Sequence, residues 1–194
     1  MRIKVAAIVL ILSSHTAYAT EIDGKSLICD VSQESHQELL ISFTDGKVVE
    51  EHIKVTTARD EDYGFLYQDG EIVKEEPKTY HLKPKEIFWC WGINLPGDLN
   101  SCTARSAEEV AGHIRFFSDA AGHWNSIDRV SLDIVKGGGL QRMVYQEKIG
   151  NCRLAEEEDI QQFRLKNLSK LDDLAETYKK LREEAENEMP DVKL

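Results

Sequence analysis

Residues 38–55 read ELLISFTDGKVVEEHIKV and carry the clearest structural pattern of the chain. Apolar side chains alternate in the first run at Leu39, Ile41 and Phe43, and a second apolar run begins at Val48. The Asp45-Gly46 pair between the runs suits a two-residue hairpin turn, because glycine accepts a positive φ without steric cost. The stretch therefore predicts an antiparallel β-hairpin.

A weaker copy of this pattern follows twenty-four positions later, where residues 67–75 read YQDGEIVKE against FTDGKVVEE at residues 43–51. Two copies are too few for a repeat architecture. They predict instead a second hairpin that turns at Asp69-Gly70.

The next strand pattern starts near Tyr80, passes Lys83-Pro84 and runs to Trp91. Ile87, Trp89 and Trp91 share one face of its last run, and Phe88 and Cys90 share the other. Apolar side chains on both faces predict a strand that is buried on both sides, at the centre of the sheet.

Residues 92–128 break the strand rhythm. Pro96-Gly97 predicts a turn, and Ser106 with Glu109 matches a capping box at the start of a helix over residues 107–121. Gly122 would end that helix. We expect a helical insertion between strands.

Alternating apolar and polar residues return after the insertion and predict a further antiparallel pair of strands. Gly137-Gly138-Gly139 is the expected hairpin loop between these strands. The pair contains Val130, Leu132 and Ile134 before the loop and Met143 and Tyr145 after it. About seven or eight short strands with mostly short connections predict a mainly β domain over residues 20–154. We expect an antiparallel meander that forms a small barrel or a sandwich.

Residues 155–194 are rich in Glu, Lys, Leu and Ala and predict a helical tail of one long helix or two. A 3-4-3-4 spacing typical of a short coiled coil joins Leu171, Leu174, Tyr178, Leu181 and Ala185. We expect the tail to pack on the domain at its start and to offer a partner-seeking or self-associating end through Leu171, Leu174, Tyr178 and Leu181.

The first nineteen residues resemble a cleavable signal peptide. Arg2 and Lys4 precede an apolar run at residues 5–12, and Ala17-Tyr18-Ala19 supplies the small-x-small cleavage pattern. We expect a periplasmic or secreted protein with no membrane insertion after cleavage.

All four cysteines lie beyond residue 19, and an even count in an exported chain predicts two disulfides. Three pairings are open, and we prefer Cys90–Cys102 with Cys29–Cys152. The chain has no C-x-x-C pair and thiolates oxidise outside the cytoplasm, so we do not expect a metal site. We expect no cofactor either.

The charge balance of 24 basic against 35 acidic side chains gives a net charge of −11. Loss of Arg2 and Lys4 leaves 22 against 35, a net of −13. This balance argues against nucleic acid and anionic lipid as partners, because both are bound through clustered Lys and Arg. A basic partner and a merely solvated acidic surface both remain open.

No sequence motif for a nucleophile, a zinc pair or a phosphate loop occurs. We therefore predict a non-catalytic module that binds an unknown protein or small ligand. One alternative is a hydrolase or isomerase that uses His113 or His123 as a base, and another is a lipocalin-like carrier. The candidate pocket residues are the aromatic side chains Trp89, Trp91, Trp124 and Tyr80.

Intact and peptide mass mapping of the exported protein, with and without reduction, tests cleavage and pairing together. We expect a chain that begins at Thr20 and contains Cys90–Cys102 and Cys29–Cys152. Free thiols in the unreduced protein would contradict the two predicted disulfides and make a metal site an open alternative again.

Overall fold

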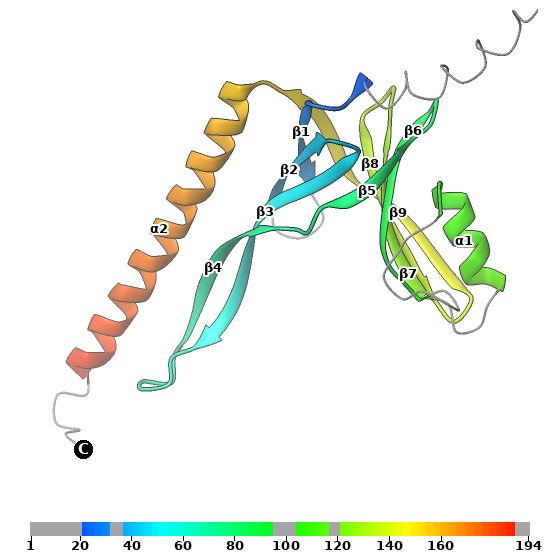
Figure 1. Cartoon of the computed structure of the whole chain (residues 1–194). Coiled ribbons are helices and arrows are strands. Elements are labelled where there is room, and N and C mark those ends of the chain that lie inside the picture. Colours follow the sequence, from blue (N-terminus) through cyan, green and yellow to red (C-terminus); the bar gives the residue numbers. More distant parts are fainter. Residues whose placement is uncertain (1–20, 32–36, 95–103, 117–120, 189–194) are drawn as a thin grey trace, which may run out of the picture.

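The computed structural model describes residues 21–31, 37–94, 104–116 and 121–188 (Figure 1). Within them the chain forms nine strands and two helices. In chain order these are β1 (Ser26–Val31), β2 (Gln37–Thr44), β3 (Lys47–Arg59), β4 (Leu66–Lys74), β5 (Lys78–Leu82), β6 (Glu86–Asn94), α1 (Ala107–Phe116), β7 (Ala121–Asp128), β8 (Asp133–Leu140), β9 (Met143–Ala155) and α2 (Glu157–Glu188).

Eight of the described strands close into an antiparallel barrel, so of the two predicted architectures the chain adopts the barrel. The order around it is β2-β1-β9-β8-β7-β6-β5-β3, and the pairing of β2 with β3 closes the ring. β3 leaves the barrel halfway along its length: residues 47–52 pair with β2, whereas residues 51–59 pair with β4. We call the projecting hairpin, residues 53–74, the arm.

The predicted hairpin at residues 38–55 is confirmed as β2 and β3, which turn at Asp45 and Gly46 with φ angles of 52° and 69°. The predicted turn at Asp69-Gly70 is wrong, because both residues lie inside β4 opposite Thr56 and Val55. A Cβ atom on Gly70 would lie 2.7 Å from Leu171 of α2, so glycine here makes room for the helix.

The arm turns instead after Arg59, where Asp60 organises the loop. The Oδ1 atom of Asp60 accepts hydrogen bonds of 2.9 Å from the backbone amides of Asp62 and Tyr63. Its Oδ2 atom accepts a 2.8 Å hydrogen bond from the Tyr178 hydroxyl of α2. The bond from the Tyr63 amide, followed by that from Tyr178, lowers the pKa of Asp60 and favours its charged form.

Strand β6 is buried on both faces, as the sequence predicts. Trp89 points into the barrel, where its ring centroid lies 6.4 Å from that of Phe43. Phe88 and Cys90 point outward and pack with Val110 and Ile114 of α1. Helix α1 therefore covers the outer face of this part of the barrel.

The insertion is shorter than the predicted span of residues 92–128. Helix α1 begins at Ala107 as expected, and the Ser106 hydroxyl accepts a 3.2 Å hydrogen bond from the Glu109 amide. The helix ends at Phe116, and residues 121–128 form the barrel strand β7 between β6 and β8. His123 and Trp124 consequently belong to a strand.

The three consecutive glycines do not form the predicted hairpin loop. Gly137, Gly138 and Gly139 lie inside β8, and the turn falls at Gln141 and Arg142, which both have positive φ. Bulky neighbours explain two of the glycines: a Cβ on Gly137 would overlap the Trp124 ring, and one on Gly138 would lie 2.5 Å from the Tyr145 hydroxyl oxygen.

Helix α2 is one continuous helix of 32 residues that extends along the arm (Figure 1). Its first turns are anchored on the barrel by Phe163, which packs with Ile28 and Leu40. Arg164 adds paired hydrogen bonds of 3.2 Å to Glu51.

The 3-4-3-4 pattern of α2 packs on a β-hairpin and not on a second helix, so the coiled coil it predicts is not formed in this structure. Leu171 and Leu174 lie against Gly70, and the Tyr178 ring lies 4.4 Å from the Tyr67 ring. The expected free end of the tail is thus docked on the arm as far as Arg182, whose Nη2 atom lies 3.4 Å from the Asp62 carboxylate.

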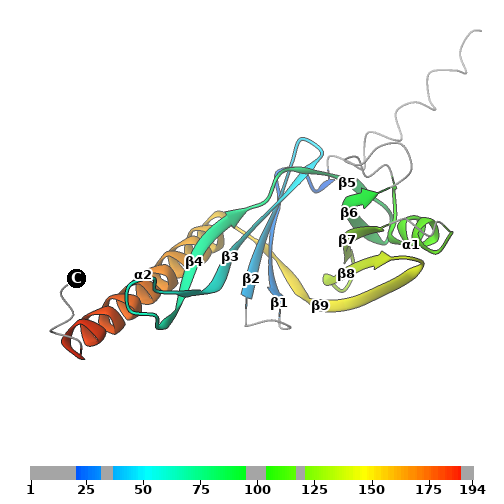
Figure 2. The same ribbon diagram turned by 90° about the horizontal axis from the view of Figure 1, so that it is seen from below.

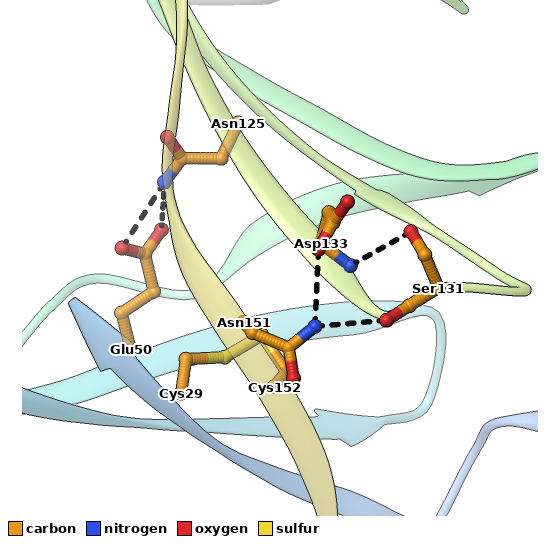
Figure 3. Close-up of a disulfide and its surroundings, with 7 residues drawn as sticks. All are labelled: Cys29, Glu50, Asn125, Ser131, Asp133, Asn151 and Cys152. Carbon is orange, nitrogen blue, oxygen red and sulfur yellow. Dashed lines mark hydrogen bonds between the residues drawn. A yellow bond between two sulfur atoms is a disulfide. The ribbon is translucent and has the colours of Figure 1, made fainter. Parts of the chain in front are cut away.

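A disulfide joins Cys29 to Cys152, as predicted, between directly paired residues of β1 and β9 (Figure 3). Because it spans 123 residues, the chain-entropy model gives it a stabilising effect of about 5 kcal/mol. The expected partner of Cys90, Cys102, lies outside the described residues, as do the turn at Pro96-Gly97 and the signal peptide. None of the described cysteines is a free thiol. In the described part of the chain, no helix has the length and apolar composition needed to cross a bilayer.

Replacing Gly137 by Ala should destabilise the barrel, because the Trp124 ring that the new methyl group would meet is fully buried. We expect urea denaturation to show a loss of about 3 kcal/mol. The matched control is Gly112→Ala in α1, where no neighbouring atom lies within 4 Å of the new Cβ. That variant should gain up to about 1 kcal/mol, and equal stability of the two variants would contradict the packing.

Candidate functional site

The four aromatic pocket candidates lie in three different environments. Trp89 and Tyr80 are inside the barrel, where Phe43 contacts both rings. Trp124 is on the outer face in the cluster under α1. Trp91 packs against the edge of the barrel core and is only partly buried. The structure therefore brings Trp89 and Tyr80 together, places Trp91 beside them at one end of the barrel, and separates Trp124 from all three.

A buried carboxylate, Glu50 of β3, lies next to Trp89 inside the barrel. Only 9% of Glu50 is exposed, and its Oε1 atom accepts a 2.6 Å hydrogen bond from the Trp89 indole. The Asn125 side-chain nitrogen donates to both carboxylate oxygens, at 3.5 Å to Oε1 and 3.4 Å to Oε2 (Figure 3). A buried charge is tolerated only when it is paired and hydrogen-bonded, so these contacts hold the carboxylate in place.

Asn125 retains an acceptor that these contacts do not use. The residue is 4% exposed, and among the described residues no donor reaches its Oδ1 atom. The amide orientation follows from the bond to Glu50, which requires Nδ2 on that side.

The register of the paired strands identifies the residues that lie next to this site on the inner face of the barrel. Directly paired residues of an antiparallel sheet point to the same face, so residues paired across β6, β7, β8 and β9 form rungs on the inner face of the barrel. The first rung contains Trp89, Asn125, Lys136 and Glu147; the second contains Trp91, His123, Gly138 and Tyr145; the third contains Ala121, Leu140 and Met143.

Exposure rises from the first rung to the second on β6 and β7, whereas on β8 and β9 the first-rung residues Lys136 and Glu147 are already exposed. Trp89 is fully buried, whereas Tyr145 of the second rung is 50% exposed and Met143 of the third is 71% exposed. The rungs therefore lead from the barrel core to solvent. We call this end of the barrel, defined by Lys78, Trp91, His123 and Tyr145 above Glu50, the mouth.

Aromatic side chains form a ladder across the mouth. The rings of Trp91 and His123 stack with a centroid distance of 6.0 Å and an interplanar angle of 26°. The Tyr145 hydroxyl lies 3.4 Å from the His123 Nδ1 atom. Gly138 permits this arrangement, because a side chain there would occupy the place of the Tyr145 ring.

Lys78, at the start of β5, is the cation of the mouth. Its Nζ atom lies 3.9 Å from Glu50 Oε1, 3.6 Å from Glu75 Oε2 and 5.1 Å from the centroid of the Trp91 ring. Its side chain is only 16% exposed. The mouth thus combines an ammonium, two carboxylates and a partly exposed indole.

The two histidines considered as bases lie on opposite faces of the same sheet. His123 belongs to the inner rungs, whereas His113 belongs to α1 on the outer face. Figure 2 shows α1 and α2 on opposite outer sides of the barrel, away from its inner face. His113 and His123 therefore cannot serve one reaction centre together.

Sequence analysis did not single out Glu50, Lys78 or Asn125. Glu50 follows Val48 at the spacing of two residues that places both on one face of β3, and this spacing was the available signal. Nothing in the sequence indicated the position of Lys78 over Trp91, because their contact depends on how β5 and β6 pair.

A separate pocket of about 590 Å³ lies on the outer face, between the β5–β6 turn and β7. Lys83, Glu86, Ser126 and Asp128 are among its lining residues. Its Asp128 carboxylate already accepts hydrogen bonds from the amides of Val130 and Ser131. The mouth, with an unused buried acceptor and exposed aromatic rings, is the better candidate site.

Glu50→Ala should destabilise the protein by about 2–3 kcal/mol, because it leaves the buried Trp89 indole without an acceptor. Glu50→Gln should cost about 1 kcal/mol, since an amide oxygen still accepts from Trp89. The control Glu71→Gln removes a carboxylate that is 65% exposed and should change stability by less than about 0.5 kcal/mol. Chemical denaturation of the three variants checks this order; an Ala variant as stable as the control would contradict it.

Among the described residues, no group of three or more His, Cys, Asp or Glu side chains is arranged to hold a metal ion. Comparison with known proteins supplies no relative, since no family model, curated protein or solved structure matches this chain.

Proposed function

We propose that this protein is an exported, non-catalytic β-barrel module that binds a partner at the mouth of its barrel. The observation that carries the proposal is the uncovered inner face of β6–β9 at the mouth. The outer face of the same strands is covered by α1, whereas Tyr145, Leu140 and Met143 on the inner face are 50%, 54% and 71% exposed.

Adjoining exposed side chains of this kind are typical of binding surfaces. Large apolar groups scattered singly on a surface are ordinary, but contiguous ones mark sites of interaction. Tyr, Trp and Met are also enriched at the centres of protein interfaces. Trp91, His123 and Tyr145 lie on the second rung, and Leu140 and Met143 lie on the third rung of the same face, so these side chains adjoin one another.

The packing of the interior favours a surface site over an internal carrier site. A lipocalin-like carrier needs an open barrel, and below the mouth the described side chains instead form one core cluster around Phe43, Tyr80 and Trp89.

Helix α2 is a weaker candidate for the partner surface. Self-association through Leu171, Leu174, Tyr178 and Leu181 would first require the helix to leave the arm. Tyr178 is held there by its hydrogen bond to Asp60 and its contact with Tyr67. We therefore assign α2 the role of supporting the arm.

Export is supported by the sequence of residues 1–19 and by the Cys29–Cys152 disulfide. Disulfides persist in oxidising compartments such as the periplasm and the extracellular space. The partner is accordingly expected in one of these compartments.

Affinity capture from the extracytoplasmic fraction of the source cells tests the proposal. Proteins that bind through the mouth should be retained by the wild type and lost with Trp91→Ala and Met143→Ser. The control Val130→Ser removes a side chain that is 90% exposed in the β7–β8 turn, beyond the other end of β7, and should retain them. With the purified captured protein, Trp91→Ala should weaken binding more than tenfold, as interface centres usually require. Identical capture by all four proteins would refute the mouth as the binding site.

A further inference from the structure

The position of Lys78 points to the chemistry of the partner, and this inference rests on the mouth being the binding site. Its ammonium group lies among the Glu50 and Glu75 carboxylates and over the Trp91 ring. Carboxylates combined with the face of an indole are the groups that recognise a cation. The mouth is therefore built as a cation site, and the chain's own lysine occupies it.

Lys78 fills this site incompletely. Charge-assisted hydrogen bonds between nitrogen and carboxylate oxygen are about 2.7–2.9 Å long. The Lys78 contacts of 3.9 Å to Glu50 and 3.6 Å to Glu75 are both longer. The Oδ1 atom of Asn125, beside Glu50, also lacks a donor among the described residues. The site thus offers acceptors that its present occupant does not satisfy.

The negative net charge of the chain favours a basic group from a partner as the occupant of this site. The chain carries a net charge of −11, which attracts basic partners during their approach. With Lys78 displaced, Glu50 and Glu75 would face the Trp91 ring without a cation between them. A guanidinium group suits this arrangement better than an ammonium group, because it is planar, stacks on aromatic rings and has five donors.

We propose that the mouth receives an arginine side chain from a basic segment of a protein partner, and that this side chain displaces Lys78. The incoming guanidinium stacks on Trp91, donates to Glu50 and Asn125, and takes the place of the Lys78 ammonium beside the Glu75 carboxylate. The exposed Tyr145, Leu140 and Met143 then contact the residues that flank the arginine. In the absence of the partner, Lys78 occupies the cation position and keeps the buried Glu50 paired.

The test uses pentaarginine amide as the probe and pentacitrulline amide as its neutral, nearly isosteric control. Trp91 fluorescence reports binding, because Trp89 and Trp124 are both 0% exposed. Pentaarginine should bind and pentacitrulline should not. Lys78→Met removes the competing ammonium and should raise the pentaarginine affinity about tenfold.

Two further variants separate a local effect from a general change of charge. Lys54→Met removes one positive charge from the arm, where Lys54 pairs with Glu71, and should leave the affinity within about twofold of wild type. Glu75→Gln leaves Glu50 paired with Lys78 and should lower the affinity about threefold to tenfold. This variant keeps the test decisive if Lys78→Met folds poorly.

The outcomes also distinguish this inference from the proposed function. Equal binding of the two peptides, an equal gain in Lys78→Met and Lys54→Met, or an unchanged affinity in Glu75→Gln would each overturn the arginine site. The capture experiment with Trp91→Ala would in those cases still decide whether the mouth binds a partner of other chemistry.

Discussion

The hydrogen bond between the Trp89 indole and the Glu50 carboxylate crosses the barrel interior and joins β6 to β3. At 2.6 Å it is the shortest of the contacts that surround the buried carboxylate. A carboxylate in a protein interior must be paired and hydrogen-bonded, so the presence of Glu50 constrains Asn125 and Lys78 to lie beside it. Lys78 in turn lies over Trp91, so the buried carboxylate of Glu50 is linked through Lys78 to the partly exposed indole of the mouth.

On both faces of β8, aromatic rings pack directly against the backbone of a glycine. Trp124 covers Gly137 on the outer face, where α1 completes the cluster. Tyr145 and His123 approach Gly138 on the inner face. Any larger residue at these positions would push the rings away, so the glycines allow one sheet to be tightly covered outside and to present an aromatic ladder inside.

The arm and α2 stabilise each other outside the barrel. A two-stranded hairpin is only marginally stable alone, and β3 and β4 have no further strand beside β4 among the described residues. Helix α2 supplies the missing cover through Leu171, Leu174 and Tyr178. The Asp60 carboxylate then joins the turn of the arm to the helix. The helix is thus best understood as part of the fold.

Local sequence determined those features that depend on neighbouring residues alone. The Asp45-Gly46 turn, the two-faced strand of Trp89, the start of α1 at Ala107 and the helical tail all follow from alternation, capping and turn chemistry. The count of four cysteines predicted disulfides but left three pairings open, and the structure shows that the preferred Cys29–Cys152 pair forms. The local pattern gave a wrong prediction where a glycine packs against a residue distant in sequence. Gly70, Gly137 and Gly138 resemble turn residues, but Gly70 makes room for α2, and Gly137 and Gly138 make room for aromatic rings.

Only the tertiary structure decided which side chains meet. Glu50, Lys78, Trp89 and Asn125 come from four strands, and their contacts arise from the register around the closed barrel. Trp124 was grouped with Trp91 by residue type, but it belongs to the outer face, because adjacent residues of a strand point to opposite sides. The sequence by itself determined a β-rich chain with a helical tail, since those depend on short-range periodicity. The mouth depends on pairing between distant strands, which no local pattern encodes.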